Sequence, residues 1–377
     1  MFVHKKINRM QKSLYIIAFI LFGLIQSCSQ SGNKGSGKQN DEVSFYTAGD
    51  FNLVEKIDMH YHFNTDDTSL VEQARQDNFR LLDIVDDRPF GLPMEEQQKF
   101  ALSLNETCPD EIAFATTFSV NDWDKAEWEK YTVTYLDSYI SMGAIAVKIW
   151  KNIGMDLKDR DGRFVMVDDA RLDTVLDFLA GKNITLIGHN GEPKDCWLPL
   201  EQMTVNGNRN YYSQHPEYHM YLHPEYPSYE DQINARDHML EKHPDLRFIG
   251  CHLGSLEWSL EELANRLDKF PNMAVDLSRM ANLHIHAMTD WQKTRDFFIK
   301  YQDRLIYGTD RSVNTTDNPA GMMKSVHNGW LNDWRFFTTD EIIEDSSVEG
   351  EVKGLKLPAG VVDNIYRRNA EKWLPGI

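Results

Sequence analysis

Short apolar runs alternate with amphipathic stretches along the chain from Val43 onward. Strands that alternate with helices in this way are typical of a parallel sheet in an α/β protein. The pattern predicts a (β/α)8 TIM barrel. An open doubly wound sheet is the competing fold, but no glycine-rich phosphate loop follows the first run. The predicted strands lie at residues 55–60, 80–85, 112–118, 144–150, 184–189, 247–252, 273–277 and 304–310.

Two amphipathic stretches predict the clearest helices. Within 168–183, apolar residues recur at helical spacing, and Gly181 is expected to end the helix. Within 255–267, leucines form one buried stripe, and Ser255 or Ser259 is expected to cap the N-terminus.

Residues 43–377 contain no second low-complexity linker, so we expect a single large domain. A last helix, at about 359–373, is expected to close the chain over the barrel. The connection at residues 190–228 is too long for a plain turn and is rich in Tyr, His and Pro. In a barrel, such a connection is expected to form a lid over the site.

The first residues have the composition of a targeting segment. Basic residues precede an apolar run at 14–25, which predicts a signal peptide at 1–27. The following Cys28 completes a sequence that resembles a bacterial lipobox, so Cys28 is expected to carry the lipid, and the Gly/Ser-rich residues 28–42 to form a flexible tether. An uncleaved N-terminal helix or an ordinary secretory signal are the alternatives. The interpretation places the protein in a bacterial cell envelope, facing the periplasm and touching the membrane only through its lipid anchor.

The chain has a formal net charge of −18, and the first 27 residues contribute only cations to that sum. Such an acidic protein is unsuited to binding nucleic acid or anionic lipid headgroups. Beyond Cys28, the cysteines are Cys108, Cys196 and Cys251, which have no zinc-ribbon spacing. The sequence allows one disulfide bond between two of these cysteines but does not show which two would pair.

Ionisable side chains end several of the predicted strands, and parallel strands of a barrel present their carboxyl ends at one rim. In a strand, residues i and i+2 point the same way, so His60 and His62 can present two imidazoles to one ion. Asp58 is expected on the same face, two residues below. The full set at the rim is His60, His62, His189, His252 and Asp310.

Neutral imidazoles and a carboxylate from separate strands are the ligands of a catalytic metal site that keeps a position for water. We therefore predict that His60, His62, His189 and Asp310 bind one divalent metal ion, with a second ion left open. His252 remains as a base.

Lys148, inside the fourth strand, has three open interpretations. It is a carbamylated bridge between two ions, a partner of a substrate carboxylate or phosphate, or a member of an ion pair inside the barrel.

Further polar residues are weaker candidates. The residues just beyond the ligand strands are expected to contact substrate: Trp150, Lys151, Asn190, Glu192 and Arg311. His215, His219 and His223 are spaced by four and could hold a second ion, but packing of the lid is the preferred interpretation. His284 and His286 are expected to form a surface feature at the start of a helix.

Five segments together resemble the amidohydrolase superfamily, and particularly its branch similar to aminocarboxymuconate-semialdehyde decarboxylase. They are "DMHYHF", "GAIAVKIW", "LIGHNGEP", "IGCHLGS" and "YGTDRS", and the resemblance runs from about residue 52 to the C-terminus. It implies a TIM barrel with a divalent ion, usually Zn²⁺, bound by the four ligands named above. It also implies that His252 orients or deprotonates the attacking water, or acts on the substrate directly, and that Asp310 carries a proton. The long loop and the lipoprotein start depart from the family's compact members, which leaves the substrate and the compartment open.

The sequence therefore predicts a metal-dependent hydrolase that uses activated water on a small carbonyl substrate, a lactone, amide or ester. Non-oxidative decarboxylation of a small acid is the alternative within the same family. From another class, a non-catalytic surface lipoprotein could use the aromatic lid to bind a glycan or a metal. A homo-oligomer is left open.

Overall fold

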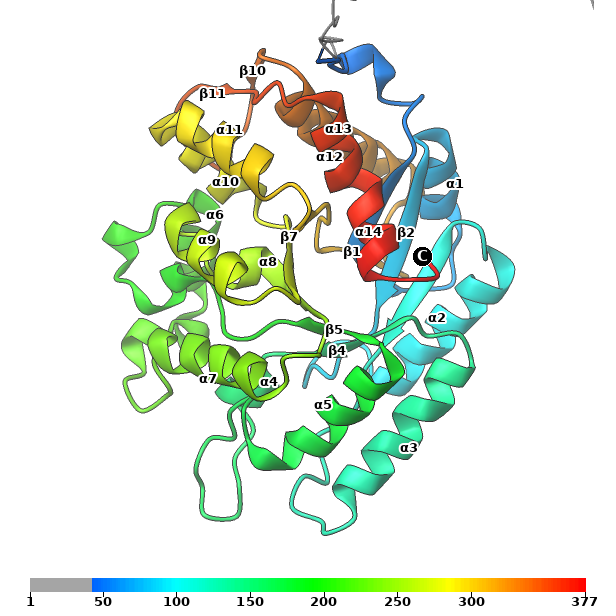
Figure 1. Cartoon of the computed structure of the whole chain (residues 1–377), viewed down its shortest axis with the longest axis vertical. Coiled ribbons are helices and arrows are strands. Elements are labelled where there is room, and N and C mark those ends of the chain that lie inside the picture. The colour runs from blue at the N-terminus through cyan, green and yellow to red at the C-terminus, as the bar shows by residue number, and fades with distance from the viewer. Residues whose placement is uncertain (1–42) are drawn as a thin grey trace, which may run out of the picture. The chain divides into compact units, whose positions relative to one another are not determined.

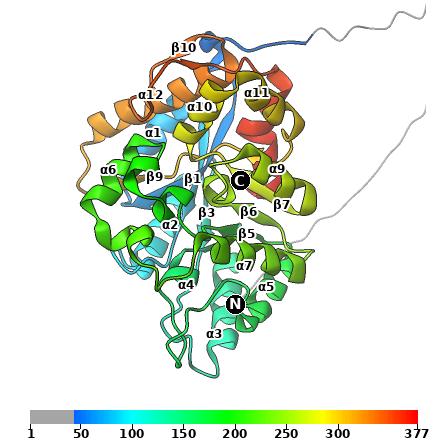
Figure 2. The same ribbon diagram turned by 90° about the vertical axis from the view of Figure 1, so that its left-hand side faces the viewer.

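A parallel sheet curls around the centre of the molecule, and helices surround it (Figures 1 and 2). The computed structural model describes residues 43–377, so the predicted signal peptide, tether and Cys28 lie outside the described residues. The strand order is β8-β7-β6-β5-β4-β3-β2-β1-β9. The strands are β1 (Lys56–Asn64), β2 (Phe79–Ile84), β3 (Ile112–Thr116), β4 (Ala146–Ile149), β5 (Thr185–Gly188), β6 (Phe248–Gly250), β7 (Met273–Asp276), β8 (Leu305–Ile306) and β9 (Arg311–Asn314).

Backbone hydrogen bonds join the chain at β8 to β1 and close the sheet. Met59 N donates to Tyr307 O at 3.1 Å, and Asp310 N donates to His60 O at 2.8 Å. Each predicted strand coincides with one of β1 to β8, and the predicted TIM barrel is confirmed.

The longer helices follow the strands and cover the outside of the barrel. They are α1 (Ser69–Gln76), α2 (Met94–Thr107), α3 (Trp128–Ser141), α5 (Ala170–Lys182), α7 (Tyr229–Lys242), α9 (Leu260–Lys269), α10 (Met280–Thr289), α11 (Trp291–Lys300) and α12 (Pro319–Thr338). A single turn, α4 (Asn152–Met155), follows β4. An antiparallel pair, β10 (Ile342–Ile343) and β11 (Val352–Lys353), follows α12.

Both predicted amphipathic helices form, with one change at an end. Ser259, and not Ser255, caps α9 by accepting a hydrogen bond from Glu262 N. Gly181 lies inside α5, and the prediction that it ends the helix is wrong. The left-handed residue is Asn183, with φ of 55°, because asparagine also tolerates that conformation.

Two apolar layers hold the barrel together. The interior cluster takes small or branched residues from every one of β1 to β8, whereas the larger cluster lies between the strands and the helices. Trp373 and Leu374 belong to the interior cluster, so the C-terminal segment plugs the barrel, as predicted. That segment consists of α13 (Ala359–Asp363), the π-helical turn η6 (Asn364–Arg368) and α14 (Asn369–Trp373).

The long connection at 190–228 follows the carboxyl end of β5 and has a small core of its own. Cys196, Met203, Tyr212 and Met220 are buried together there with Met155. Its helical turns are η2 (Lys194–Trp197), η3 (Leu200–Gln202), α6 (Asn206–Gln214), η4 (Pro216–Tyr218) and η5 (Met220–Leu222). The remaining short elements are η1 (Ala48–Asp50) and α8 (Cys251–Gly254).

Within residues 43–377, no helix is both long and apolar enough to cross a lipid bilayer. Cys108, Cys196 and Cys251 are buried free thiols, so the structure forms no disulfide among these three cysteines.

Candidate metal centre

A β-bulge in β1 turns two histidines into the barrel. Against β2, Asp58 lies opposite Leu81 and Tyr61 lies opposite Asp83, so β1 has one residue more than its partner over this step. Met59 belongs to the interior cluster and Tyr61 to the outer one. The extra residue shifts the alternation, and both His60 and His62 then face the interior.

The same bulge sends Asp58 the other way. Its Oδ2 accepts hydrogen bonds from Trp330 Nε1 of α12 at 3.0 Å and from Thr309 Oγ1 at 2.7 Å. The prediction that Asp58 shares a face with His60 is therefore wrong, because it assumed unbroken alternation along the strand.

His60, His62 and Asp310 form the centre of the candidate metal site. Asp310 Oδ1 lies 3.2 Å from His60 Nε2 and 3.4 Å from His62 Nε2. Three ligand atoms bound tetrahedrally to zinc at about 2.0–2.1 Å would lie roughly 3.3–3.4 Å apart. The spacing therefore fits one small divalent cation.

The tautomers of the two histidines also fit a cation. His62 Nδ1 donates to the carbonyl oxygen of Ile84 at 2.7 Å, which an unprotonated nitrogen could not do. His60 Nδ1 lies 2.6 Å from Asp276 Oδ2, a buried carboxylate whose pKa is held below its usual range by contacts with His60, although burial opposes this. Both Nε2 atoms therefore turn lone pairs toward the Asp310 carboxylate, and a cation between them would remove the repulsion.

Asp310 is held in an unusual backbone conformation. Its φ is 56°, in the left-handed region that residues other than glycine seldom adopt. Burial among protein groups raises its pKa, but the neighbouring His60, His252 and His62 outweigh this and keep the pKa well below the usual value. The carboxylate is thus ionised, while 34% of the side chain stays open to solvent at the mouth of the barrel.

Two further histidines turn unsatisfied nitrogens toward this centre. His189 Nε2 and His252 Nε2 are buried and accept or donate no hydrogen bond among the described residues. Their rings meet edge to face with centroids 4.4 Å apart, and His252 Nε2 lies 3.7 Å from Asp310 Oδ2. Burial lowers the pKa of both imidazoles well below the usual value, so both are neutral at neutral pH. His189, the fourth predicted ligand, does not belong to the tight group of His60, His62 and Asp310, whose ligand atoms lie within 4.8 Å of one another.

Asp276, at the end of β7, is a site residue that our sequence prediction missed. Besides holding His60, it accepts hydrogen bonds at Oδ1 from His252 N at 2.7 Å and from Ser278 Oγ at 2.7 Å. Ser278 Oγ in turn lies 2.8 Å from His252 Nδ1. Because Ser278 gives its proton to Asp276, His252 Nδ1 donates to Ser278, and His252 Nε2 is left as the basic nitrogen. The signal was present, since Asp276 ends an apolar strand like the other rim residues.

His252 sits in a left-handed turn. The φ values of His252, Leu253, Gly254 and Ser255 are 56°, 57°, 64° and 55°. Each residue other than glycine costs roughly 1–2 kcal/mol in this conformation. Hydrogen bonds from buried Arg236 to Gly254 O, and from Tyr229 Oη to Ser255 O at 2.5 Å, hold the turn in place.

Lys148 lies deeper in the barrel than the predicted ligands. Its Nζ donates to Cys251 Sγ at 2.8 Å, and its charge helps burial to lower the pKa of His60. Among the described residues Lys148 forms no ion pair, so the interpretation of Lys148 as a member of an ion pair gains no support, and its other two interpretations stay predictions.

The structure brings three of the five predicted substrate contacts to the mouth. Lys151 forms an ion pair with Glu192, whose Oε2 is 3.7 Å from His189 Nε2. Trp150 packs its ring edge to face with Phe90, with centroids 5.8 Å apart.

The other two predicted contacts point elsewhere. The amide of Asn190 lies against Gly188 on the face of β5 that Phe248 covers, which is the outer face. Arg311 reaches toward α12, where its Nη1 is 3.4 Å from Ser325 O. One-residue steps along a strand reverse the side chain, which explains why neighbours of rim residues leave the rim.

The lid histidines have packing roles in the structure. His219 Nε2 bonds to Leu198 O at 2.8 Å, and His223 Nε2 bonds to Pro216 O at 2.9 Å, while His215 pairs with Glu217. None of these three belongs to a group of residues that could hold a metal ion.

The prediction of a surface feature at His284 is wrong. His284 is buried and its Nδ1 lies 2.6 Å from Asp345 Oδ2, because α10 turns it toward the segment before β11.

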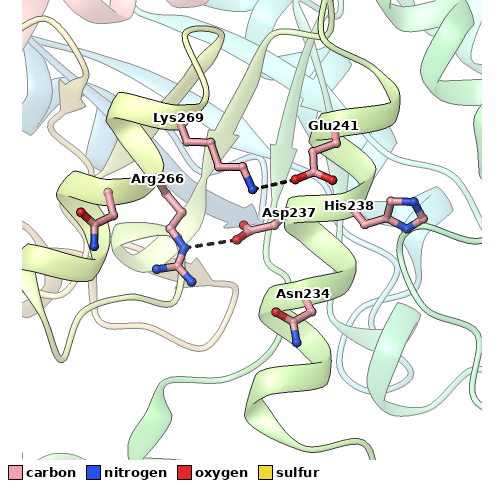
Figure 3. Close-up of a pocket in the computed structure, with 7 residues that line it drawn as sticks. Asn234, Asp237, His238, Glu241, Arg266 and Lys269 are labelled. Atoms are coloured by element: carbon pink, nitrogen blue, oxygen red, sulfur yellow. Dashed lines mark hydrogen bonds and ion pairs between the residues drawn. The ribbon is translucent and has the colours of Figure 1, made fainter.

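A separate cavity between α7 and α9 also gathers charged residues (Figure 3). There, Arg266 pairs with Asp237 at 3.2 Å and Lys269 pairs with Glu241 at 2.6 Å. These charges neutralise one another on the outer surface, away from the barrel mouth.

The comparisons with known proteins agree with this fold. The model of the Amidohydrolase family matches residues 150–376. The chain belongs to the amidohydrolase family. The matched region includes His189, His252 and Asp310 but begins after the two histidines of β1.

Two solved structures share the fold of this amidohydrolase. A 2,6-dihydroxybenzoate decarboxylase from Rhizobium has 13% sequence identity and a TM-score of 0.50, covering 85% of this chain and 98% of its own. A 2,6-dihydroxybenzoate decarboxylase complexed with 2,6-dihydroxybenzoate has 13% identity and a TM-score of 0.51, with the same coverage of 85% and 98%. No curated protein matches this amidohydrolase in sequence.

Proposed function

We propose that this amidohydrolase is a metal-dependent hydrolase of a small carbonyl substrate, a lactone, amide or ester. The observation that supports it best is the convergence of His60 Nε2, His62 Nε2 and Asp310 Oδ1 at 3.2–3.4 Å, with all three free to bind a cation. His189 completes the proposed ligand set, and Zn²⁺ is the metal that this donor set suits best. When bound, such a cation polarises a carbonyl and lowers the pKa of water.

The protein's own residues then have distinct tasks. His252 Nε2 is the general base, because Ser278 fixes its Nδ1 as a donor and leaves Nε2 unprotonated. Asp310, exposed at the mouth and 3.7 Å from His252 Nε2, is placed to exchange a proton with it. Trp150, Lys151 and Glu192 line the approach to the site.

Elemental analysis of purified protein tests the metal directly. We expect about one zinc per chain, and loss of zinc in His60→Ala and in Asp310→Asn. His238→Ala is the matched control, because His238 is exposed on α7 and, within residues 43–377, its ion-pair partner is Asp168. Full zinc content in both site variants would contradict the proposed ligands.

The reaction is tested with a panel of lactones, amides and esters in water enriched in ¹⁸O. Incorporation of one labelled oxygen into the product supports hydrolysis. Stoichiometric release of carbon dioxide without incorporation of label would instead establish decarboxylation of a small acid.

We also propose that the chain is a lipoprotein of a bacterial cell envelope, facing the periplasm, with lipid at Cys28. The support is the basic and apolar segment before Cys28 and the polar tether after it. In a bacterial host fed a radioactive fatty acid, label in the full chain but not in Cys28→Ser is expected. Equal labelling of both would overturn this assignment.

A further inference from the structure

Lys148 of β4 and Cys251, which directly follows β6, meet inside the barrel. Lys148 Nζ lies 2.8 Å from Cys251 Sγ, although β5 separates their two strands in the sheet. The two residues are 1% and 0% exposed, respectively. The contact joins segments that lie 103 residues apart in the chain. It therefore exists only when the barrel is closed.

The distance between the two atoms is short for a hydrogen bond to sulfur. Hydrogen bonds from nitrogen to oxygen most often have a length of about 2.9–3.0 Å. Sulfur is a larger atom than oxygen, so an N–H···S hydrogen bond is expected to be longer still. An oxygen atom bonded to both nitrogen and sulfur would instead hold them two bond lengths apart across a bent angle, which is a separation of this size.

Lys148 has no carboxylate partner within residues 43–377, and Cys251 Sγ accepts its hydrogen bond. Cys108, Cys196 and Cys251 are free thiols, so the described part of the chain places no second thiol in a disulfide with Cys251. An oxidised Cys251 would therefore have the amine of Lys148 as its neighbouring nucleophile. A buried charge without a counter-ion is costly, and a covalent bond that neutralises the amine would remove that cost.

We propose that Lys148 and Cys251 form a site of oxidative modification, at which a peroxide links Nζ to Sγ through one oxygen atom. The proposal goes beyond the hydrolase function and does not depend on it. Burial raises the pKa of the Cys251 thiol to about 12 in spite of the neighbouring lysine, so little thiolate is present at neutral pH. Because the thiolate is the reactive form, the link is expected to form slowly.

Two molecules of hydrogen peroxide supply the oxidation. The first converts the thiol S–H into a sulfenic acid, S–OH, and releases water. The second converts one N–H bond of the neutral amine into a hydroxylamine, N–OH, and also releases water. The hydroxylamine oxygen then bonds to sulfur, the S–OH oxygen leaves as a third water, and the product is N–O–S. The two side chains together lose four electrons, gain one oxygen atom and lose two hydrogen atoms.

The link would lie directly beside the proposed metal centre. Cys251 precedes His252 in the chain, and ligand atoms of Cys251, His60 and Asp276 lie within 4.8 Å of one another. The link would join β4 to the strand end that carries His252. A cross-link between distant segments restricts the unfolded chain, so the modified protein is expected to resist unfolding better than the reduced protein.

Mass spectrometry of the full chain tests the proposal. The protein is reduced with dithiothreitol, freed of it, incubated with ¹⁸O-labelled hydrogen peroxide and digested without reductant. We expect a pair of peptides linked between Lys148 and Cys251 that has gained one ¹⁸O atom and lost two hydrogen atoms. A second treatment with dithiothreitol should release both peptides unmodified, because its thiols return the four electrons. The linked chain should also have a higher midpoint of urea unfolding than the reduced chain.

Three variants show whether the link is specific to this pair. Cys251→Ser and Lys148→Gln should give no linked peptides and no difference in unfolding midpoint after peroxide. Cys196→Ser is the matched control, because Cys196 is an equally buried free thiol whose Sγ contacts the carbonyl oxygen of Tyr218, and its link should form as in the unchanged chain. Circular dichroism shows that each variant keeps its fold.

Absence of the linked peptides from the oxidised, unchanged chain would overturn the proposal, whatever the variants do. Oxidation of Cys251 that stops at sulfenic or sulfinic acid would also overturn it, as would a link that dithiothreitol does not break or one that forms in Cys251→Ser. None of these measurements uses hydrolase activity or zinc content, so the proposed function is tested separately.

Discussion

His60 Nδ1 on β1 is hydrogen-bonded to Asp276 Oδ2 on β7 at 2.6 Å, across the interior of the barrel. This contact fixes the tautomer of His60 and turns its Nε2 toward Asp310. Asp276 thus controls a proposed metal ligand without lying in the tight group itself.

Replacing Asp276 with Asn is expected to weaken zinc binding about 10–100-fold, the usual effect of losing a carboxylate behind a ligating histidine. The amide can no longer accept from both His60 and the backbone of His252 as a charged group does. Competition with a zinc-binding dye measures the affinity. Asp296→Asn, on the exposed face of α11, is the control, and an unchanged affinity in Asp276→Asn would contradict the role.

Replacing Asp58 with Asn tests whether its side chain faces outward, as the bulge in β1 requires, or inward, as unbroken alternation along the strand predicted. Because Asp58 is fully buried and accepts from Trp330 and Thr309, the variant should lose about 1–3 kcal/mol of unfolding free energy. Its zinc content should stay at the level of the unchanged chain, because Asp58 faces α12 and not the metal site. Urea unfolding and elemental analysis check the two expectations, and a loss of zinc with unchanged stability would show that Asp58 faces inward.

Removing the hydroxyl of Tyr229 tests the support of the left-handed turn. Tyr229→Phe deletes the hydrogen bond to Ser255 O and should cost about 1–2 kcal/mol of unfolding free energy. Hydrogen exchange should become faster in the turn around His252 than elsewhere in the barrel. Tyr131→Phe is a suitable control because Tyr131 is 67% exposed. If the turn kept its native protection, the hydroxyl would not be holding it.

The buried carboxyl of Glu257 predicts a pH dependence of stability. Burial raises its pKa from 4.5 to about 7, so the folded protein holds this proton more tightly than the unfolded chain. Its contribution is therefore fully present below pH 4.5 and is lost as the pH rises through about 7. The shift corresponds to about 3 kcal/mol.

Glu257→Gln should remove that part of the pH dependence. Urea unfolding at pH 5 and pH 8 compares the unchanged chain with this variant and with Glu261→Gln, an exposed neighbour on α9. The fall in stability between the two pH values should be smaller in Glu257→Gln alone. An equal fall in all three proteins would mean that Glu257 titrates normally.

The sequence by itself determined the fold and the residues at the carboxyl ends of the barrel strands. Apolar runs located β1 to β8, because burial on both faces of a parallel strand requires them, whereas the edge strand β9 was not predicted. Polar residues at the ends of those runs identified His60, His62, His189, His252 and Asp310, because parallel strands end at one rim.

Only the tertiary structure decided which side chains face one another. Because of the bulge in β1, the side chain of Asp58 faces outward from the barrel. Asn190 and Arg311 are one residue away from rim residues, so their side chains point away from the mouth. Asp276 gained its importance from its contacts with His60 and His252, which lie far from it in the sequence. Local periodicity records burial, whereas partners across a barrel depend on register and on backbone irregularities that no short stretch of sequence encodes.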